Sequence, residues 1–331
     1  MNLDSARELK ASLVNKHVKR LIMNRRIVSA LSLGARSTDQ VDPIQHTIAL
    51  GVSRKGEQEY RLAVRIQNRA LENSLQIEEI TKQAKGEADV RYIGRLVKRS
   101  KPWNQSRQRP LLIGISIAHF RVTAGTLGCF VKTRKGAALR ILSNNHVLAN
   151  ENRGRKGDAV LQAGPFDGGK KGKDTVGVLD KYVRLNRAGT NLVDAALATV
   201  LDNVNFDGMT LRGIGDLNGL GGSVVDVGDE VQKVGRTTDV THGRVTAFEL
   251  DNVVVGYDIG NLRFNNQVEI EGVGSGPFSQ GGDSGSLIVD ADHRAIALLF
   301  AGGDQGGANG QGLTYANPLD KVLEDLDVNL V

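Results

Sequence analysis

Apolar residues near the start of the chain recur at helical spacing, with basic residues mostly between them. These apolar positions are Leu9, Leu13, Val18, Leu21, Ile22 and Val28. Ser5 with Glu8 has the form of a capping box, and Gly34 that of a C-cap. We therefore predict an amphipathic helix over 4–33 within a helical arm of residues 1–34. The pattern leaves open whether the arm binds a partner or packs on its own protein.

Alternation of apolar and polar positions then indicates a small α/β domain over residues 35–100. Its clearest strand is Tyr60–Ile66, which alternates as a half-buried strand does. The other expected elements are strands over 46–52 and 89–93 and a helix over 75–85 that Ser74 caps and Gly86 ends. Because no catalytic set of side chains occurs here, we interpret this domain as a regulatory, docking or assembly module.

The polar, proline-bounded segment 101–110 has the composition of a linker, and short β-branched runs separated by glycines follow it. We expect strands at 112–117, 124–131, 138–142, 253–255, 287–289 and 295–300, and a short closing helix within 318–330. This spacing predicts a mainly β domain over 111–331, built as an antiparallel sandwich or a pair of barrels.

Composition supports many tight turns and excludes several protein classes. Glycine supplies 40 of 331 residues, well above the usual share of about 7%. No apolar run approaches the roughly 18 residues of a membrane-spanning helix. Cys129 is the single cysteine, so an internal disulfide is impossible and a reducing, cytoplasmic location is the simplest interpretation.

The charge is divided unevenly along the chain. Residues 1–110 carry 22 Lys and Arg against 11 Asp and Glu, whereas the remainder carries 21 against 26. An anionic partner such as nucleic acid is one interpretation of the basic part. Docking on the acidic part, or simple solvation, is the interpretation that we favour, because no nucleic-acid motif occurs.

Three motifs in the last 220 residues suggest catalysis when they are taken together. They are S-N-N-H-V-L at 143–148, V-D-A-A-L-A at 193–198 and G-G-D-S-G-S-L-I at 281–288. Each alone has a structural explanation, such as a hydrogen-bonded histidine, a structural carboxylate or an ordinary glycine turn. Their order of histidine, acid and serine is that of the chymotrypsin-type triad.

The residue types match the demands of acyl transfer. Ser284 would be the nucleophile and needs His146 as general base, while Asp194 would orient the imidazole and stabilise its charged form. The N–H groups of Gly282 and Ser284 would form the oxyanion hole.

The sequence resembles the trypsin-like (chymotrypsin-fold) serine peptidases over about residues 111–320. Besides the three motifs, the resemblance rests on V-Q-K-V-G-R-T-T at 231–238, T-H-G-R-V at 241–245, F-A-G-G at 300–303 and Y-A-N-P at 315–318. The whole chain is similar to intracellular bacterial members, which are distantly similar to the plant narrow-leaf proteins. The resemblance implies a chymotrypsin-like double β-barrel preceded by the helix and the small α/β domain. His146 and Asp194 would come from the first barrel and Ser284 from the second.

Two features depart from that family. Asp283 matches the carboxylate that braces the oxyanion turn, yet Arg109 precedes Pro110 rather than a typical new N-terminus, so a lysine, an arginine or a preset loop would replace the usual amine. No serine stands in the strand 295–300 to donate to Asp194, and we expect the Ser143 hydroxyl to do so instead.

By family position, the specificity pocket would be lined by Phe278, Ser279, Phe300, Ala301 and Gly302. Without an aspartate at the pocket floor, a preference for a small or apolar side chain is expected, rather than for lysine or arginine.

The leading hypothesis is a serine endopeptidase that acts on protein or peptide substrates without a metal or cofactor. Residues 1–100 would regulate it or bind a regulatory partner or a second copy. A catalytically idle binding scaffold with a basic arm is the alternative, and a protease tethered to nucleic acid is a third hypothesis. The remaining histidines lack the spacing of a metal site.

Overall fold

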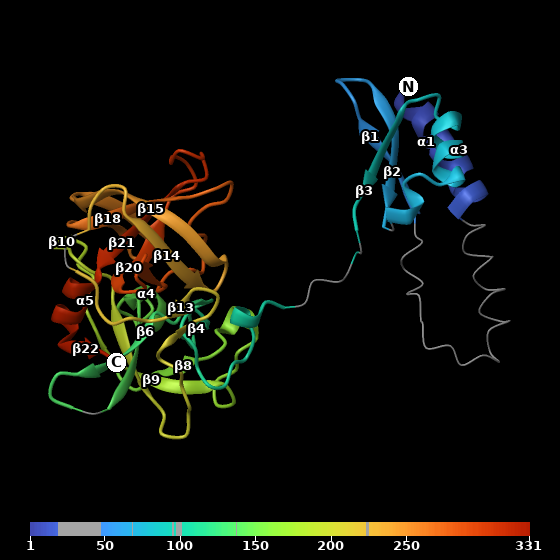
Figure 1. Cartoon of the computed structure of the whole chain (residues 1–331). Coiled ribbons are helices and arrows are strands. Elements are labelled where there is room, and N and C mark those ends of the chain that lie inside the picture. The colour runs from blue at the N-terminus through green and yellow to red at the C-terminus, as the bar shows by residue number, and fades with distance from the viewer. Residues whose placement is uncertain (19–47, 68, 95, 97–100, 137, 223–224) are drawn as a thin grey trace, which may run out of the picture. The chain divides into compact units, whose positions relative to one another are not determined.

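The computed structural model describes residues 1–18, 48–67, 69–94, 96, 101–136, 138–222 and 225–331. The chain forms two compact units, Met1–Ser100 and Lys101–Val331 (Figure 1). Within the described residues, no helix has the length and apolar character needed to cross a membrane.

The first unit is a three-stranded sheet in the order β1-β2-β3 with helices packed on it. Strand β2 pairs antiparallel with β1 and parallel with β3. The elements are α1 (Leu3–Leu13), a π-helical turn (Val14–Val18), β1 (Ile48–Arg54), β2 (Tyr60–Ile66), a 3₁₀ turn (Arg69–Leu71), α3 (Leu75–Gln83) and β3 (Ala88–Tyr92).

Helix α1 belongs to the same body as this sheet. Leu13 of α1, Leu62 of β2 and Ile80 of α3 are all fully buried in one apolar cluster, and Figure 1 shows both helices on one side of the sheet. Their apolar stripes are therefore covered by the unit's own strands, so of the two alternatives that the sequence left open, the described part of the first helix packs on its own protein.

Of the two N-caps that the sequence predicted, Ser74 is confirmed and Ser5 is not. The capping box at Ser5 is wrong, because α1 begins at Leu3 and the Asn2 side chain accepts the Ser5 N–H at 2.8 Å. Ser74 does cap α3, accepting from the Ile77 N–H as an N-cap residue should. The rest of the expected first helix, including Gly34, lies outside the described residues.

The second unit opens with an eight-stranded sheet in the order β22-β6-β7-β11-β9-β8-β4-β5. Its strands are β4 (Ser116–His119), β5 (Gly125–Thr126), β6 (Cys129–Thr133), β7 (Leu139–Ser143), β8 (Ala159–Leu161), β9 (Thr175–Tyr182), β11 (Ala196–Val200) and β22 (Val328–Leu330). Only Leu127 and Gly128 separate β5, at one end of this order, from β6, next to the other end. The sheet must therefore curl back on itself, and it forms an open, half-closed barrel.

A closed six-stranded barrel follows, in the order β14-β15-β18-β21-β20-β19. Its strands are β14 (Glu230–Gly235), β15 (Asp239–Leu250), β18 (Gln267–Gly272), β19 (Leu287–Asp290), β20 (Ala295–Gly302) and β21 (Leu313–Pro318). Beside it lie the small sheets of β10 (Thr190–Asn191) with β16 (Val253–Tyr257) and β17 (Gly260–Phe264), and of β12 (Thr210–Leu211) with β13 (Gly215–Asp216). Helix α5 (Leu319–Leu326) leads into β22. The expected mainly β, double-barrel fold is confirmed.

The two barrels touch closely where the site forms. A Cβ on Gly128 would lie 2.5 Å from the Gly285 carbonyl oxygen, so only glycine permits this approach of the backbones. Ser284 O accepts the Thr126 N–H at 2.8 Å, which ties the serine turn to the first barrel. The position of the serine is thus set by contact between the barrels.

The expected linker 101–110 is not a free connection. Trp103–Gln105 forms a 3₁₀ turn, and Asn104 is buried with its side-chain amide on the Gly235 carbonyl oxygen at 2.6 Å. The polar composition that suggested a linker instead supplies hydrogen bonds to the barrel, so the second unit begins at Lys101.

Candidate active site

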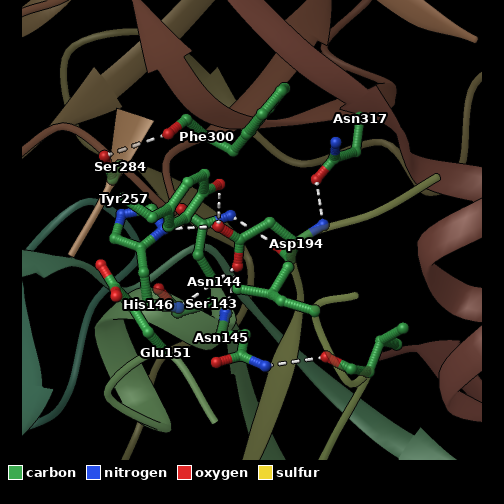
Figure 2. A network of polar contacts seen from close by, with 12 residues as sticks. Ser143, Asn144, Asn145, His146, Glu151, Asp194, Tyr257, Ser284, Phe300 and Asn317 are labelled. Carbon is green, nitrogen blue, oxygen red and sulfur yellow. Dashed lines mark hydrogen bonds and ion pairs between the residues drawn. The ribbon is translucent and has the colours of Figure 1, made fainter. Parts of the chain in front are cut away.

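The pairing of β7 with β11 brings His146 beside Asp194. Ser143, the last residue of β7, lies opposite Ala196, the first residue of β11. The residues just after β7 form the short helix α4 (Asn145–Leu148), which therefore starts next to Asp194. The Nδ1 atom of His146 lies 2.6 Å from Oδ2 of Asp194 (Figure 2).

The Asp194 carboxylate is fully buried and surrounded by donors. Oδ1 accepts the N–H groups of Asn145 at 2.6 Å and His146 at 3.2 Å. Oδ2 accepts from the Tyr257 hydroxyl at 2.7 Å as well as from His146. The Asp194 N–H donates to Asn317 Oδ1 at 2.9 Å. Four donors compensate the carboxylate for the water that it has lost.

The hydroxyl on Asp194 comes from Tyr257 and not from Ser143. Ser143 Oγ donates to the Thr126 carbonyl oxygen at 2.7 Å, so it is directed away from the carboxylate. Tyr257 ends β16, and its ring meets His146 edge-on at 5.8 Å between centroids. In the sequence, Tyr257 is a single aromatic residue 63 positions from Asp194, and no local motif marks it.

The surroundings push the pKa values of the pair in opposite directions. Burial lowers the pKa of His146, but the Asp194 charge, its hydrogen bond and the charge of Glu151 outweigh burial and raise it overall. Burial raises the pKa of Asp194, and the His146 charge and the hydrogen bonds more than reverse this. Burial first, and then Asp194, raise the pKa of Tyr257, so its hydroxyl stays a donor. The imidazole is thereby held as a partner of an ionised carboxylate.

Ser284 and His146 line the same cavity of about 590 Å³. The Ser284 Oγ lies 3.5 Å from the Phe300 carbonyl oxygen (Figure 2). Of the acceptors in the described part of the chain, none takes the N–H of Gly282 or Ser284. The two amides predicted for the oxyanion hole are therefore available to a ligand.

The orientation of the Gly281–Gly282 peptide is fixed by Thr237. The Thr237 hydroxyl donates to the Gly281 carbonyl oxygen at 2.8 Å. In a trans peptide the N–H points opposite to the C=O, so the Gly282 N–H is directed away from Thr237. Gly282 has φ +99° and a Cβ there would lie 2.6 Å from the Thr237 Oγ1. This turn therefore requires glycine.

Asp283 braces the turn from a fully buried position. Its carboxylate accepts the N–H groups of Thr237 at 2.7 Å and Gln280 at 2.9 Å, and the Thr238 hydroxyl at 2.8 Å. The Lys233 ammonium lies 3.7 Å away and is equally buried. Burial lowers the pKa of Lys233, and the Asp283 charge opposes that shift. Of the alternatives left open by the sequence, both a lysine and a preset loop are present.

The cavity also contains most of the predicted specificity residues. Ser279, Phe300, Ala301 and Gly302 line it. Phe278 does not, because its ring packs in the core of the second barrel. The next residue, Ser279, does line the cavity, and its hydroxyl pairs with the buried Thr314 hydroxyl at 2.7 Å. The expectation for Phe278 is therefore wrong.

The single cysteine is buried and free. Burial raises the pKa of the Cys129 thiol to about 12, so it stays protonated. Among the described residues, no group of three or more His, Cys, Asp or Glu side chains could hold a metal ion.

No protein-family model and no curated protein matches the chain. Among solved structures, it is similar to Thermobifida fusca Protease A, with 16% identity and a TM-score of 0.47 over 67% of this chain and 98% of that one. It is also similar to Cellulomonas bogoriensis chymotrypsin, with 18% identity and a TM-score of 0.46 over 67% of this chain and 98% of that one. A third similar structure is a glutamic acid specific serine protease, with 22% identity and a TM-score of 0.48 over 67% of this chain and 100% of that one. Identities this low say nothing about the chemistry of the site, which follows from its own geometry.

Replacing Tyr257 by phenylalanine removes one donor from a buried carboxylate. We expect Tyr257→Phe to lower the free energy of unfolding by about 1.5–3 kcal/mol, the usual contribution of a hydrogen bond to a charged group. The pKa of His146 should rise, because Asp194 then holds its charge with fewer donors. Chemical denaturation and NMR titration of the His146 ring measure the two effects.

The matched control is Tyr182→Phe, which removes a hydroxyl that donates to the neutral Asn152 carbonyl oxygen at 3.3 Å. It should cost at most about 0.5–1.5 kcal/mol and leave the His146 titration unchanged. Equal effects of the two variants would contradict the assigned role of Tyr257.

Removing the charge of Glu151 should lower the pKa of His146, because that charge helps to raise it. A reaction that needs neutral His146 would then begin at a lower pH in Glu151→Gln than in the wild type. NMR titration of the His146 ring checks the direction. In Asp258→Asn, which changes a carboxylate paired with Arg153 at 3.5 Å, no shift is expected. A shift to higher pH in Glu151→Gln would refute the electrostatic explanation.

Proposed function

We propose that this protein is a serine endopeptidase with Ser284 as nucleophile, His146 as general base and acid, and Asp194 as the orienting carboxylate. The observation that supports it most directly is one cavity lined by the aspartate-bound His146 and by Ser284, in a turn where the N–H groups of Gly282 and Ser284 have no acceptor among the described residues. No separate structural task accounts for two free N–H groups beside this pair.

In the proposed reaction, the Ser284 hydroxyl turns toward His146 Nε2 and attacks the substrate carbonyl carbon while Nε2 takes its proton. The carbonyl oxygen gains negative charge and accepts the N–H groups of Gly282 and Ser284. His146 then gives the proton to the leaving amine, which leaves an acyl group on Ser284. A water molecule then attacks the acyl group while His146 takes its proton, and His146 returns that proton to Ser284 as the acid product leaves. Throughout, Asp194 stays ionised and holds Nδ1–H.

A catalytically idle binding protein is the second candidate, and one observation favours it. The Ser284 hydroxyl faces the Phe300 carbonyl oxygen at 3.5 Å. A serine held permanently in this way could not pass its proton to His146. We favour catalysis because the single bond to Phe300 is long and needs only a side-chain rotation to break.

We further propose that the first unit regulates the peptidase or binds its partner. Its described residues form a folded body with a core of its own, and the chemistry lies in the second unit. Cys129 is a reduced, buried thiol that needs no oxidising compartment, so a cytoplasmic location belongs to this proposal.

A fluorophosphonate probe tests the activated serine. We expect one probe per wild-type chain in intact-mass spectra and none on Ser284→Ala. His146→Ala should react roughly 10²- to 10⁴-fold more slowly or not at all, because the hydroxyl then lacks its base. Ser275→Ala, which changes an exposed serine of the same glycine-rich region, is the control that should label like the wild type. A wild-type protein that does not label would support the binding protein.

The cavity beside Ser284 favours a small or apolar side chain before the cleaved bond. Phe300, Ala301 and Gly302 line it together with Ser279, and a Cβ on Gly302 would lie 3.3 Å from Ser279 Oγ, so there is little room for a bulky side chain. A peptide-library digest should therefore be dominated by small or apolar residues at that position. Gly302→Ala should narrow the preference toward the smallest of them. A profile dominated by lysine and arginine at that position would contradict the proposed preference for small or apolar side chains.

A further inference from the structure

Residues 101–109, which we name the entry strap, lie along the turn that holds the oxyanion hole. This turn, named here the bracing turn, is Gly235–Asp239 and joins β14 to β15. Asn104 Nδ2 donates to the Gly235 carbonyl oxygen at 2.6 Å, and Gln105 Nε2 donates to the Arg236 carbonyl oxygen at 3.1 Å. The Trp103 indole N–H lies 3.2 and 3.3 Å from the two carboxylate oxygens of Asp239. The strap thus binds the turn along its whole length.

Gln105 and Asp283 hold opposite edges of one peptide unit. The Arg236 carbonyl oxygen accepts from Gln105, while the N–H of the same peptide, that of Thr237, donates to Asp283 Oδ1 at 2.7 Å. A hydrogen bond on the carbonyl oxygen polarises the peptide and strengthens the N–H as a donor. Gln105 therefore acts on Asp283 through a single rigid plane.

Asn104 does the same on the preceding peptide. The Gly235 carbonyl oxygen accepts from Asn104, and the Arg236 N–H donates to Thr126 Oγ1 at 3.0 Å. Thr126 Oγ1 in turn donates to the Gly282 carbonyl oxygen at 2.9 Å. From Asn104 to the oxyanion turn there are only three hydrogen bonds, with no flexible segment between them.

The strap is itself fixed to the first barrel. The Gln162 carboxamide oxygen accepts the Gln108 N–H at 2.9 Å and the Arg109 guanidinium at 2.6 Å. Lys101 donates to the Asp167 carbonyl oxygen. Asp167 binds the Arg236 guanidinium through both oxygens, at 2.6 and 2.9 Å. The bracing turn is therefore held between an anchored strap and the oxyanion turn.

From this arrangement we infer that Asn104 and Gln105 are positioning residues for the oxyanion hole. They fix the two peptides that hold Asp283 and Gly282, so the N–H groups of Gly282 and Ser284 are aimed before a substrate binds. This inference rests on the proposed peptidase function. The strap follows the first unit directly in the chain. The first unit is therefore covalently joined to the residues that position the oxyanion hole.

The experiment measures fluorophosphonate labelling of the full chain at several probe concentrations. A fluorophosphonate places its phosphoryl oxygen in the oxyanion hole, so its maximal labelling rate reports the aim of those amides. Asn104→Ala and Gln105→Ala should each lower that maximal rate about tenfold, less than the roughly 100-fold loss of a direct oxyanion donor. The probe concentration that gives half the maximal rate should stay unchanged, because the binding surface is intact.

Ser106→Ala is the matched control in the same strap. Its hydroxyl donates to the Pro102 carbonyl oxygen at 2.9 Å and does not touch the bracing turn. It should label at the wild-type rate. Gln105 is partly exposed, so its variant keeps the test valid if the buried Asn104→Ala fails to fold.

The outcomes separate this inference from the proposed function. Unlabelled wild-type protein would overturn the peptidase and the inference with it. A labelled wild type with Asn104 and Gln105 variants of equal maximal rate would overturn the inference alone. A uniform loss that includes Ser106→Ala, or a change only in the half-maximal probe concentration, would show a general effect on the strap and would also overturn it.

Discussion

Two buried carboxylates, Asp194 and Asp283, impose the constraint on which the site depends. A carboxylate that has lost its water destabilises the fold unless donors replace that water. In this protein the donors come from segments far apart in the chain, so satisfying each charge fixes several segments at once. Asp194 joins α4 to the β16–β17 hairpin through His146 and Tyr257. Asp283 joins the serine turn to the bracing turn and Lys233.

The same donors supply the order that acyl transfer needs. Catalytic groups are effective when they are fixed before the substrate arrives. Each group proposed for the chemistry is held by neighbours that also compensate a charge: the imidazole by Asp194, and the turn that carries Gly282 and Ser284 by Asp283. Stability of the fold and preparation of the site therefore depend on the same hydrogen bonds. The entry strap extends this network to the point where the chain enters the second unit.

The sequence predicted the local elements well where the pattern was strong. Tyr60–Ile66 is a strand with the expected bounds, and Ser74 begins a helix as its type suggests. It failed at the first helix, where Asn2 competes with Ser5 for the cap and lies one turn earlier. It also failed at residues 101–110, because a polar segment has the same composition whether its side chains bind water or backbone carbonyls. Asn104 is buried, which no composition could indicate.

By itself, the sequence determined the fold class and the residue types of the candidate site. Glycine turns and short β runs are local properties, and His146, Asp194 and Ser284 each stand in a local motif. Only the tertiary structure decided what surrounds them. Tyr257 donates to Asp194, Ser143 does not, and Phe278 packs in the core, because strand pairing and barrel contact determine where a side chain points. The demand that a buried charge be satisfied is predictable from the residue type. Which donor satisfies it depends on the packing of residues that are distant in the chain, and no local sequence pattern predicts that packing.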